Sequence, residues 1–541
     1  MKRRQFIKLS SSATALALTP FQLQAALKSF MPFVDCPDVS NRKLVLINLA
    51  GGNDGLNTLI PLNQYDDYKG RLRRTIGVAE NSLIELDTTL GGNKQIGLNP
   101  ALQPFKSIYD QGRLRIIQSV GYPFFNKSHF KSTDLYLTGN DGDSLDNGRN
   151  SGWIGRFMEQ QYEDLLTAPF PLGIQIGTTQ ASLGFKGEHS HGLSMNLTGQ
   201  DVEGFFSVLN GLAGEAPLEI PDSDYGDQIK FLINTDNASN KYAEAISDAF
   251  TKGNNDASYP DTGLADQLKT VARLISGDLG SKIYMVRLSG FDTHNSQVAS
   301  EGNILGNHHN LLTEVADAVE GFMTDLTNQN LDGDVVGLTF SEFGRKAAEN
   351  GNLGTDHGEI APMFIFGTPV QGGVSGTNPI LSEAQSNNNF QIQTVQYDYR
   401  DTFATLLQNF LGADNAVIDE TFFNHYETRS FTEAKLNEVL KAEFNLANCA
   451  TFSTDNLLKE NKKWLLHPNP VQDIINFSTT IKGASKVSFK VYNTLGKLLM
   501  NQTNVLEFGQ LNLNLKHLKS GLYLFHIEVD GQIETHKVVK I

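Results

Sequence analysis

Four segments of the chain share one pattern, a run of apolar residues followed at once by a loop of glycines and polar side chains. They read "KLVLINLAGGNDG" from residue 43, "RLRIIQSVGYPFFNKSHF" from 113, "KIYMVRLSGFDTH" from 282 and "DVVGLTFSEFGR" from 334. Segments with a helical apolar period, such as "HHNLLTEVADAVEGFMTDL", lie between them. Buried strands that alternate with helices predict an α/β domain with a mostly parallel sheet flanked by helices.

Polar residues able to carry chemistry follow each apolar run. Ligands of such sheets bind beyond the carboxyl ends of the strands. We therefore expect these residues to meet at one edge of the sheet, although they are far apart in sequence. They are Asn53 with Asp54, Ser128 with His129, Asp292 with His294, and Ser341 with Glu342 and Arg345.

The last part of the chain, from about residue 464, has a different pattern. Val487, Phe489 and Val491 alternate with polar or partly polar neighbours, as do the odd-numbered positions 523–529, and Asp530-Gly531 is a hairpin turn signal. Short alternating strands with frequent turns predict a small antiparallel β-sandwich. A carbohydrate-binding or adhesive sandwich has the same pattern. A helix and polar linker are expected between the two parts, at 429–463.

Composition narrows the possible partners. A chain of 541 residues is too long to fold around one ordinary hydrophobic core, so we expect at least two domains. The formal net charge of −16 makes nucleic acid an unsuitable partner, since phosphate contacts need clustered Lys and Arg. The two cysteines, Cys36 and Cys449, form either one disulfide between the ends of the main domain or two separate thiols.

The first 26 residues have the layout of an export signal. The chain opens "MKRRQFIKLSSSATALALTPFQLQAAL", a basic start, a short apolar middle and small residues near Ala25 and Ala26. The apolar middle is too short for a permanent membrane anchor. The sequence "RRQFIK" resembles the twin-arginine signal, which implies the twin-arginine translocon as a partner. The alternative is an ordinary basic signal peptide.

Asp292 and His294 have the spacing of two metal ligands. Residues i and i+2 of an extended chain point to the same side, so this pair can offer an oxygen and a nitrogen to one ion. Such a donor set suits zinc, manganese or iron better than calcium. His357, in "GTDHGEIAP", is a candidate third ligand. The alternative is a helix-capping aspartate beside an ordinary surface histidine.

Asp54, Glu342 and Ser128 each have a chemical and a structural interpretation. The two acids follow strands, and the glycines of "GGNDG" allow a tight turn around Asp54, although the same residues also favour a plain turn. The phosphate-loop pattern is absent. Ser128 precedes a predicted helix, whose positive end stabilises an alkoxide or a phosphate. Alternatively it is only an N-cap.

Five segments of residues 42–428 closely resemble the family called domain of unknown function 1501. They are "LAGGNDGLNTLIPL", "NKSHFKSTDLYLTG", "FDTHNSQ", "SEFGRKAAENGNLGTDHG" and "YDYRDTFATLLQNFLG". That family is similar to the alkaline phosphatase and sulfatase superfamily, so the resemblance implies an alkaline-phosphatase-like fold and divalent metal, zinc or manganese. The implied metal ligands are Asp54, Asp292, His294, Glu342 and His357, with Asp356 orienting its loop.

The resemblance also implies a reaction. Ser128 falls about where the superfamily nucleophile begins its helix, Arg345 can clamp a phosphate, and Thr133 is a reserve nucleophile. His129, Phe130 and Lys131 follow Ser128 in place of the sulfatase modification signal, which favours phosphate esters over sulfate esters. Phe343 follows Glu342 where the superfamily has a histidine, so one or two ions are expected.

The end of the chain, 464–541, resembles the type A C-terminal sorting domain of the type IX secretion system. The segments are "LHPNPVQDIINF", "VYNTLGKLL" and "LKSGLYLFHIEVDGQIETHKVVKI". This implies a secreted or cell-surface protein that passes through the periplasm and meets the type IX machinery. We therefore expect a secreted metal-dependent hydrolase of phosphate esters, with a non-catalytic metal- or glycan-binding envelope protein as the alternative.

Overall fold

The structure is a computed structural model of the 541-residue chain, and it divides into two compact units. One is Cys36–Ala447, and the other contains Asn448–Ile541. The residues that it describes are 38–142, 151–177, 183–188, 194–197, 242–300, 302, 305–422, 436, 438–446, 464–467, 471–479, 486–493, 498–505, 510–519, 521–529 and 532–540. The expected export signal, both cysteines and the Asp530-Gly531 turn lie outside these ranges.

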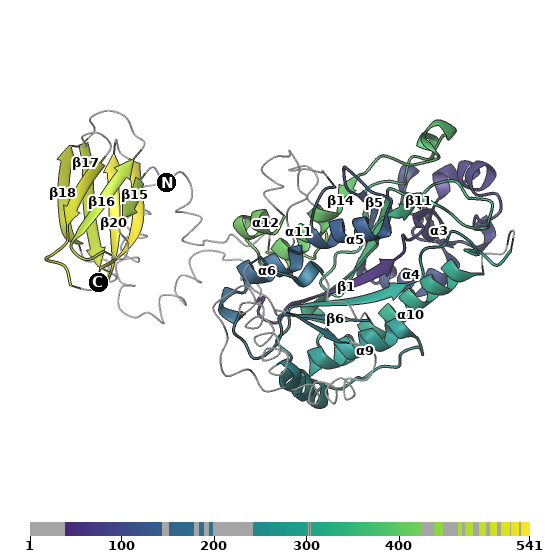
Figure 1. The fold of residues 1–541 in the computed structure, drawn as a ribbon, viewed down its shortest axis with the longest axis horizontal. Coiled ribbons are helices and arrows are strands. Elements are labelled where there is room, and N and C mark those ends of the chain that lie inside the picture. Colours follow the sequence, from purple (N-terminus) through teal and green to yellow (C-terminus); the bar gives the residue numbers. More distant parts are fainter. Residues whose placement is uncertain are drawn as a thin grey trace, which may run out of the picture. The chain divides into compact units, whose positions relative to one another are not determined.

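A mixed, mostly parallel sheet forms the centre of the larger unit (Figure 1). Its strands, in spatial order, are β13 (Gly373–Ser375), β5 (Leu114–Gly121), β12 (Ala361–Phe366), β9 (Val335–Phe340), β1 (Lys43–Ala50), β8 (Ile283–Ser289), β6 (Gly173–Ile176) and β7 (Ser194–Leu197), with β14 (Tyr397–Asp398) beside β5. Among these described strands only β12 runs antiparallel to its neighbours, β5 and β9. The predicted α/β fold class is confirmed.

Helices cover both faces of this sheet (Figure 1). One layer consists of α4 (Gln103–Asp110), α9 (Gly263–Ser276) and α10 (Asn307–Asn328); the other consists of α5 (His129–Thr138), α6 (Trp153–Gln161), α11 (Tyr399–Asn409) and α12 (Asn415–Thr421). Each helical layer forms a hydrophobic core with one face of the sheet, and successive strand side chains point to opposite faces. In β1, Val45 and Ile47 pack with the first layer, whereas Leu44 and Leu46 pack with the second. Every residue of β1 is buried, as a strand covered on both faces requires.

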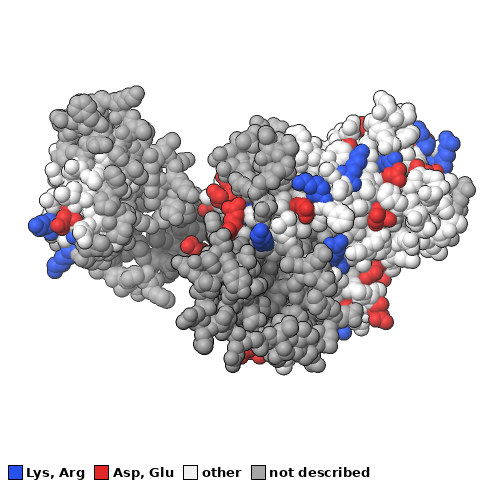
Figure 2. Space-filling view, in the orientation of Figure 1, with Lys and Arg blue, Asp and Glu red and all other residues white. Residues whose placement is uncertain are grey.

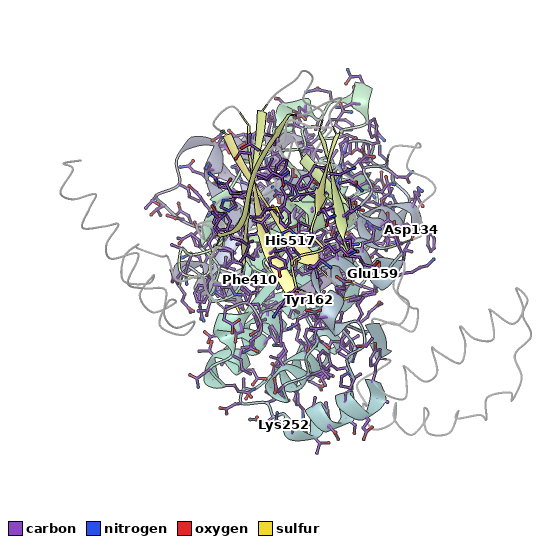
Figure 3. All side chains as sticks on the ribbon, turned by 90° about the vertical axis from the view of Figure 1, so that its left-hand side faces the viewer. Asp134, Glu159, Tyr162, Lys252, Phe410 and His517 are labelled. Atoms are coloured by element: carbon purple, nitrogen blue, oxygen red, sulfur yellow. The ribbon has the colours of Figure 1, made fainter. Side chains whose placement is uncertain are left out.

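Smaller elements surround the sheet. They are α3 (Gly55–Thr58), β2 (Leu59–Pro61), β3 (Ile84–Glu85), β4 (Ile96–Leu98), β10 (Gly344–Arg345), β11 (His357–Gly358) and short 3₁₀ and π turns. In the predicted helix-and-linker segment, the described residues 438–446 form turns, and Leu440 bridges to Val370. On the face shown in Figure 2, Lys and Arg side chains are interspersed with Asp and Glu over the described surface. Exposed charges such as Lys252 lie at the outer edge of the side chains drawn in Figure 3.

The C-terminal unit contains two antiparallel sheets, as the alternating pattern predicts. One sheet has the order β15 (Trp464–His467), β16 (Ile474–Thr479) and β19 (Gln510–Asn514); the other has β18 (Leu498–Val505), β17 (Lys486–Asn493), β20 (Gly521–Val529) and β21 (Gln532–Lys540). A single core joins the sheets, with the ring of Phe477 4.7 Å from that of Phe489. Val529 pairs with Gln532, which matches a two-residue hairpin connection. No described helix has the length and apolarity needed to cross a membrane.

Candidate metal centre

The polar ends of several strands converge at one edge of the central sheet. Asp292 and His294 follow β8, Glu342 follows β9, and His129 opens α5. His357 lies shortly before β12, and because β12 runs antiparallel to its neighbours, its start lies at the same edge as their carboxyl ends. The reversed strand therefore explains how a residue before a strand joins residues that follow strands.

Three imidazole nitrogens surround one carboxylate oxygen. Asp292 Oδ1 lies 3.2 Å from His129 Nε2, 3.3 Å from His294 Nε2 and 3.5 Å from His357 Nε2. The Nε2 atoms of His294 and His357 are 2.8 Å apart. His129, Asp292 and His357 alone already satisfy the spacing of a metal site. The two predicted ligands Asp292 and His294 and the predicted third ligand His357 thus lie together.

The opposite nitrogen of each imidazole is held by an oxygen. His129 Nδ1 is 2.8 Å from Glu342 Oε1, His294 Nδ1 is 3.0 Å from Asp356 Oδ1, and His357 Nδ1 is 2.7 Å from the Lys127 carbonyl. An ionised carboxylate or a carbonyl can only accept a hydrogen bond, so each Nδ1 carries the proton. In a neutral imidazole this leaves the lone pair on Nε2, pointing towards Asp292.

This arrangement fits a cation. Two Nε2 lone pairs at 2.8 Å repel each other unless a proton or a metal ion lies between or beside them. His129 Nε2 is also buried without a hydrogen-bond partner. Three nitrogens and one carboxylate oxygen form a donor set that suits zinc, manganese or iron. Outer oxygens that fix the tautomer of ligating histidines are typical of metal centres.

Charges around the cluster shift the pKa values of its members. Burial acts to raise the pKa of Asp292, but the hydrogen bond and charge of Arg345 outweigh it and lower that pKa. The hydrogen bond to Glu342 raises the pKa of His129, against the effect of burial. Burial lowers the pKa of His357. Asp292 is thus ionised at neutral pH, and His357 is predominantly neutral, as metal ligands must be.

Arg345 holds the loops of the site together. Its guanidinium is fully buried and donates to the carbonyls of Gly51, Gly52, Phe291 and Thr355 as well as to Asp292 Oδ1, at 2.7 Å. A guanidinium has five N–H donors, and these contacts occupy nearly all of them. The structure therefore places Arg345 as a positioning residue that fixes Asp292, with little capacity left for the predicted phosphate clamp.

Asp54 lies apart from the histidine cluster, in a buried ion pair. Its Oδ2 accepts from Arg73 and from Gln297, and both Asp54 and Arg73 side chains are 0% exposed. Burial acts to raise the pKa of Asp54, but the Arg73 charge outweighs it and lowers that pKa. The carboxylate that was expected to bind metal thus pairs with a guanidinium through Oδ2, whereas its Oδ1 is buried without a hydrogen-bond partner.

Glu342 belongs to the cluster through His129, and its Oε1 also accepts the Gly51 N–H at 2.8 Å. Gly51 has φ 123°, and a Cβ at this position would lie 2.3 Å from the Asp292 backbone nitrogen. Gly51 is therefore required by close approach to the Asp292 loop, whereas a Cβ at Gly52 would meet the Phe343 ring and one at Gly55 would meet Pro362. Phe343, which departs from the superfamily pattern, is buried against the His129 and His357 rings, with centroids 4.7 and 4.8 Å away.

Ser128 is the N-cap residue of α5, is exposed, and makes no side-chain capping bond. Both of its chain neighbours contact the cluster, Lys127 through its carbonyl to His357 and His129 through its ring. Ser128 thus lies between Lys127, which holds the His357 ring, and His129, a candidate ligand. Thr133, one turn further along α5, lines the adjoining cavity.

His129 belongs to the cluster, although the sequence analysis placed it only in a polar loop and did not assign it as a ligand. It stands directly after the candidate nucleophile at the start of a helix, and it shares its place after a strand with the candidate ligands Asp292 and His294. Asp356 was expected to orient its loop. It does so by contacting His294 and Lys346, at 3.0 and 2.8 Å. Burial acts to raise the pKa of Asp356. Hydrogen bonds from Lys346, Asn350 and His294 outweigh this effect and lower the pKa to about 2.

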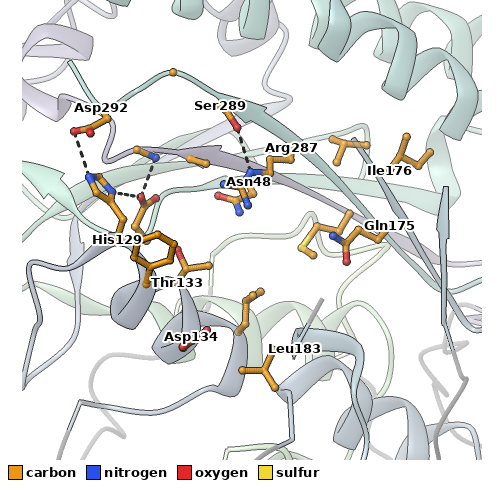
Figure 4. Close-up of a pocket in the computed structure, with 18 residues that line it drawn as sticks. Asn48, His129, Thr133, Asp134, Gln175, Ile176, Leu183, Arg287, Ser289 and Asp292 are labelled. Carbon is orange, nitrogen blue, oxygen red and sulfur yellow. Dashed lines mark hydrogen bonds and ion pairs between the residues drawn. The ribbon is translucent and has the colours of Figure 1, made fainter. Parts of the chain in front are cut away.

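A cavity of about 480 Å³ opens beside the cluster (Figure 4). Its wall includes Asp292 and His129 at one end and Gln175 and Ile176 at the other, and Glu342 also lines it. The volume lies within the ~300–1,000 Å³ range of small-molecule sites. The cluster is therefore accessible to a ligand that occupies the cavity.

Two family models match the chain. Residues 244–418 match "Protein of unknown function (DUF1501)", and residues 465–541 match "Secretion system C-terminal sorting domain". Both resemblances expected from the sequence are confirmed. The type IX sorting tail implies that the protein is secreted or lies on the cell surface. No curated protein matches the chain.

Several solved structures are similar to the chain. A protein in the alkaline phosphatase superfamily from Vibrio parahaemolyticus is 9% identical, with 91% of this chain and 78% of that chain covered and a TM-score of 0.30. The PsFucS1 sulfatase from Pseudoalteromonas sp. is 11% identical, with 88% and 84% covered and a TM-score of 0.30. Both TM-scores are well below 0.5, so neither similarity bears on the activity of this chain.

A third similarity involves a small part of each protein. Dimeric latent PorU from Porphyromonas gingivalis is 18% identical, with a TM-score of 0.13, and the match covers 14% of this chain and 9% of that chain. This chain therefore spans about a tenth of the length of that protein.

Proposed function

We propose that the protein is a secreted hydrolase of phosphate esters that uses one divalent ion, zinc or manganese, held by His129, Asp292, His294 and His357. The observation that carries the proposal is the convergence of three Nε2 atoms on Asp292 Oδ1, at 3.2 to 3.5 Å, with each opposite Nδ1 held by an oxygen. Histidines that only pack or cap do not need such matched tautomers.

One ion is proposed because only one candidate acid faces the histidine nitrogens. Asp292 contacts a guanidinium but is 50% exposed and lies 3.2 Å from His129 Nε2, whereas Asp54 pairs with Arg73 in a site with no exposure. Phe343 places an aromatic ring against the two histidines where a second set of ligands would be needed. The expected stoichiometry is therefore one ion per chain.

Ser128 is the proposed nucleophile. It lies at the positive end of the α5 dipole, and its chain neighbours contact His357 and His129. Its hydroxyl makes no capping bond that would have to be broken before attack. A divalent ion, when bound, neutralises the phosphate group and lowers the pKa of the attacking hydroxyl. A covalent phosphoserine that is later hydrolysed is the expected course.

Other side chains position the reacting groups. Arg345 fixes the Asp292 carboxylate, and Asp356 and the Lys127 carbonyl hold the rings of His294 and His357. Glu342 holds the His129 ring and the Gly51 N–H together. These contacts exist without ligand, so little reorganisation is needed when substrate binds.

Metal content tests the site directly. Protein purified without chelator is expected to contain about one zinc or manganese ion per chain, and His294→Ala is expected to lose most of it. His309→Gln is a matched control, because His309 lies in the same unit but bonds Asn99, at 3.3 Å, away from the cluster. Loss of metal in the control, or full metal content in His294→Ala, would contradict the site.

Turnover tests the reaction. A panel of phosphate, phosphonate and sulfate esters is expected to show phosphate-ester hydrolysis that EDTA abolishes. Ser128→Ala is expected to lose turnover by at least 10²-fold while metal content is unchanged, and Thr133→Val is the matched control on the same helix. Activity lost only in Thr133→Val would move the nucleophile to that residue. No turnover of any ester with any metal would favour the non-catalytic binding protein.

The export route is part of the proposal. A twin-arginine-type signal at 1–26 would carry the chain, already folded, into the periplasm, and the domain at 464–541 would carry it across the outer membrane and be removed. Mass spectrometry of surface and culture fractions is expected to find no peptides from before about Ala25 or from the final strands. An intact chain confined to the cytoplasm would contradict this route.

A further inference from the structure

One wall of the cavity is polar where the sheet is otherwise apolar. On the face covered by α5 and α6, Leu44 and Leu46 of β1 are followed by Asn48, and Ile283 and Met285 of β8 are followed by Arg287. Asn48 and Arg287 are paired neighbours in the parallel register. The strand β6 adds Gln175, which is opposite Met285. Three adjacent strands thus change from core to polar as they reach the cavity.

Two of these polar side chains make few hydrogen bonds to the protein. Asn48 is only 7% exposed, and within the described part of the chain its side-chain amide bonds no other residue. The half-buried Arg287 side chain bonds only Ser289 Oγ, at 3.2 Å, through Nε, and no carboxylate of a described residue lies within 4 Å of its guanidinium. Both residues line the cavity, so a ligand there can bind their remaining donors and acceptors.

The cavity also has an exposed aromatic rim. Phe130, in the first turn of α5, lines the cavity and is 87% exposed. The face of this ring is open to the cavity and suits the apolar face of a pyranose ring. Figure 4 shows His129 and Asp292 at one side, Asn48 and Arg287 in the middle and Gln175 at the other side.

We propose that this cavity recognises the sugar of an acidic carbohydrate ester, with Arg287 binding an anionic group distant from the reacting phosphate and Asn48 binding ring hydroxyls. The inference rests on the proposed function, because the reacting ester must lie at the histidine cluster. A side-chain amide donates and accepts, as neighbouring sugar hydroxyls require. A guanidinium without a carboxylate partner favours carboxylate, sulfate or phosphate, which it binds with paired N–H groups.

Three substrates test the proposed sugar contact and the proposed anion contact separately. Glucose 1,6-bisphosphate has a sugar and a second anionic group, glucose 6-phosphate lacks the second group, and 4-nitrophenyl phosphate lacks the sugar. The wild-type full chain is expected to prefer the bisphosphate to glucose 6-phosphate by at least tenfold in kcat/KM. A hydrogen bond to a charged group typically accounts for about 10- to 100-fold in affinity.

Variants of Arg287 and Asn48 test each contact. Arg287→Gln is expected to remove the preference for the bisphosphate through KM, to leave 4-nitrophenyl phosphate within twofold, and to be partly rescued by Arg287→Lys. Asn48→Leu is expected to weaken both hexose phosphates but not 4-nitrophenyl phosphate. Equal effects of Arg287→Gln on all three substrates, or no preference in the wild type, would overturn the proposal.

A binding measurement separates this inference from the proposed reaction. Calorimetry of glucose 1,6-bisphosphate with the full chain in EDTA is expected to show binding that Arg287→Gln weakens at least tenfold. If no ester is hydrolysed but this dependence is found, the reaction fails and the pocket assignment stands. If 4-nitrophenyl phosphate is hydrolysed but neither binding nor preference depends on Arg287, the pocket assignment fails and the reaction stands.

Discussion

The substitution Asp54→Asn separates a structural role of Asp54 from a role as metal ligand. The structure pairs this carboxylate with Arg73, both fully buried, and Arg73 also donates to Asn57 Oδ1 at 2.8 Å and to the Ala347 carbonyl at 2.9 Å. Asparagine keeps the shape of the side chain but removes its charge. The guanidinium would then remain buried with neutral acceptors only.

The expected cost is large. Removing one partner of a buried ion pair destabilises a protein by about 3–5 kcal/mol, because the remaining charge is uncompensated. A typical domain has only about 5–15 kcal/mol of stability in total. The surface pair Arg71–Asp67, 2.8 Å apart with side chains 34% and 41% exposed, gives the contrast, since such helical pairs contribute about 0.3–0.5 kcal/mol.

Urea unfolding and metal analysis of the same samples provide the assay. Asp54→Asn is expected to lower the free energy of unfolding by about 3–5 kcal/mol, and Asp67→Asn by less than about 0.5 kcal/mol, with one ion per folded chain retained in both. Replacing both partners, Asp54→Leu with Arg73→Met, is expected to recover much of the loss. Normal stability together with loss of metal in Asp54→Asn would refute the structural assignment and support the ligand predicted from sequence.

Three other predictions follow from single residues. Burial lowers the pKa of His308 from 6.5 to about 4, so as pH falls this histidine binds a proton in the unfolded protein before it does so in the folded protein. The free energy of unfolding is therefore expected to decrease by about 3 kcal/mol between pH 6.5 and 4. His308→Gln should remove this pH dependence in urea titrations. Asp356→Asn weakens the bond that orients His294 and is expected to reduce metal affinity about 10- to 100-fold in competition with a chelating dye. Gly51→Ala is expected to lose metal binding through its backbone clash, whereas Gly112→Ala, with φ 67° and nothing within 4 Å, should cost only about 1–2 kcal/mol in thermal unfolding.

The fold could be predicted from sequence because its signals are local. Apolar runs such as 43–49 contain side chains for two cores at once, and that pattern requires a strand covered on both faces. The alternation of Val487, Phe489 and Val491 likewise requires a sheet with one buried face. Local patterns do not reveal which strand runs antiparallel, because direction depends on pairing across the sheet rather than on residue type.

The candidate metal site was only partly predictable for the same reason. The spacing of Asp292 and His294 brings two candidate ligands together within one loop, so the sequence alone indicated that they would lie side by side. Asp54 has the same kind of signal, an acid after a strand, yet its setting depends on Arg73, a residue nineteen positions away whose direction no motif indicates. Whether an acid at the end of a strand can bind metal or forms an ion pair depends on which residues the fold places beside it.

The reversed strand β12 connects these observations. A parallel β12 would place its first residues, and His357 before them, at the opposite edge of the sheet from Asp292. Because β12 is antiparallel, it begins at the edge of the sheet where Asp292 lies, and His357 therefore lies beside His294. From there the Nδ1 of His357 reaches the carbonyl of Lys127, the residue before Ser128. One change of strand direction thus brings a proposed ligand to the cluster and fixes the loop that carries the proposed nucleophile. Altering the start of β12 should therefore affect metal binding and turnover together, even where no ligand is changed.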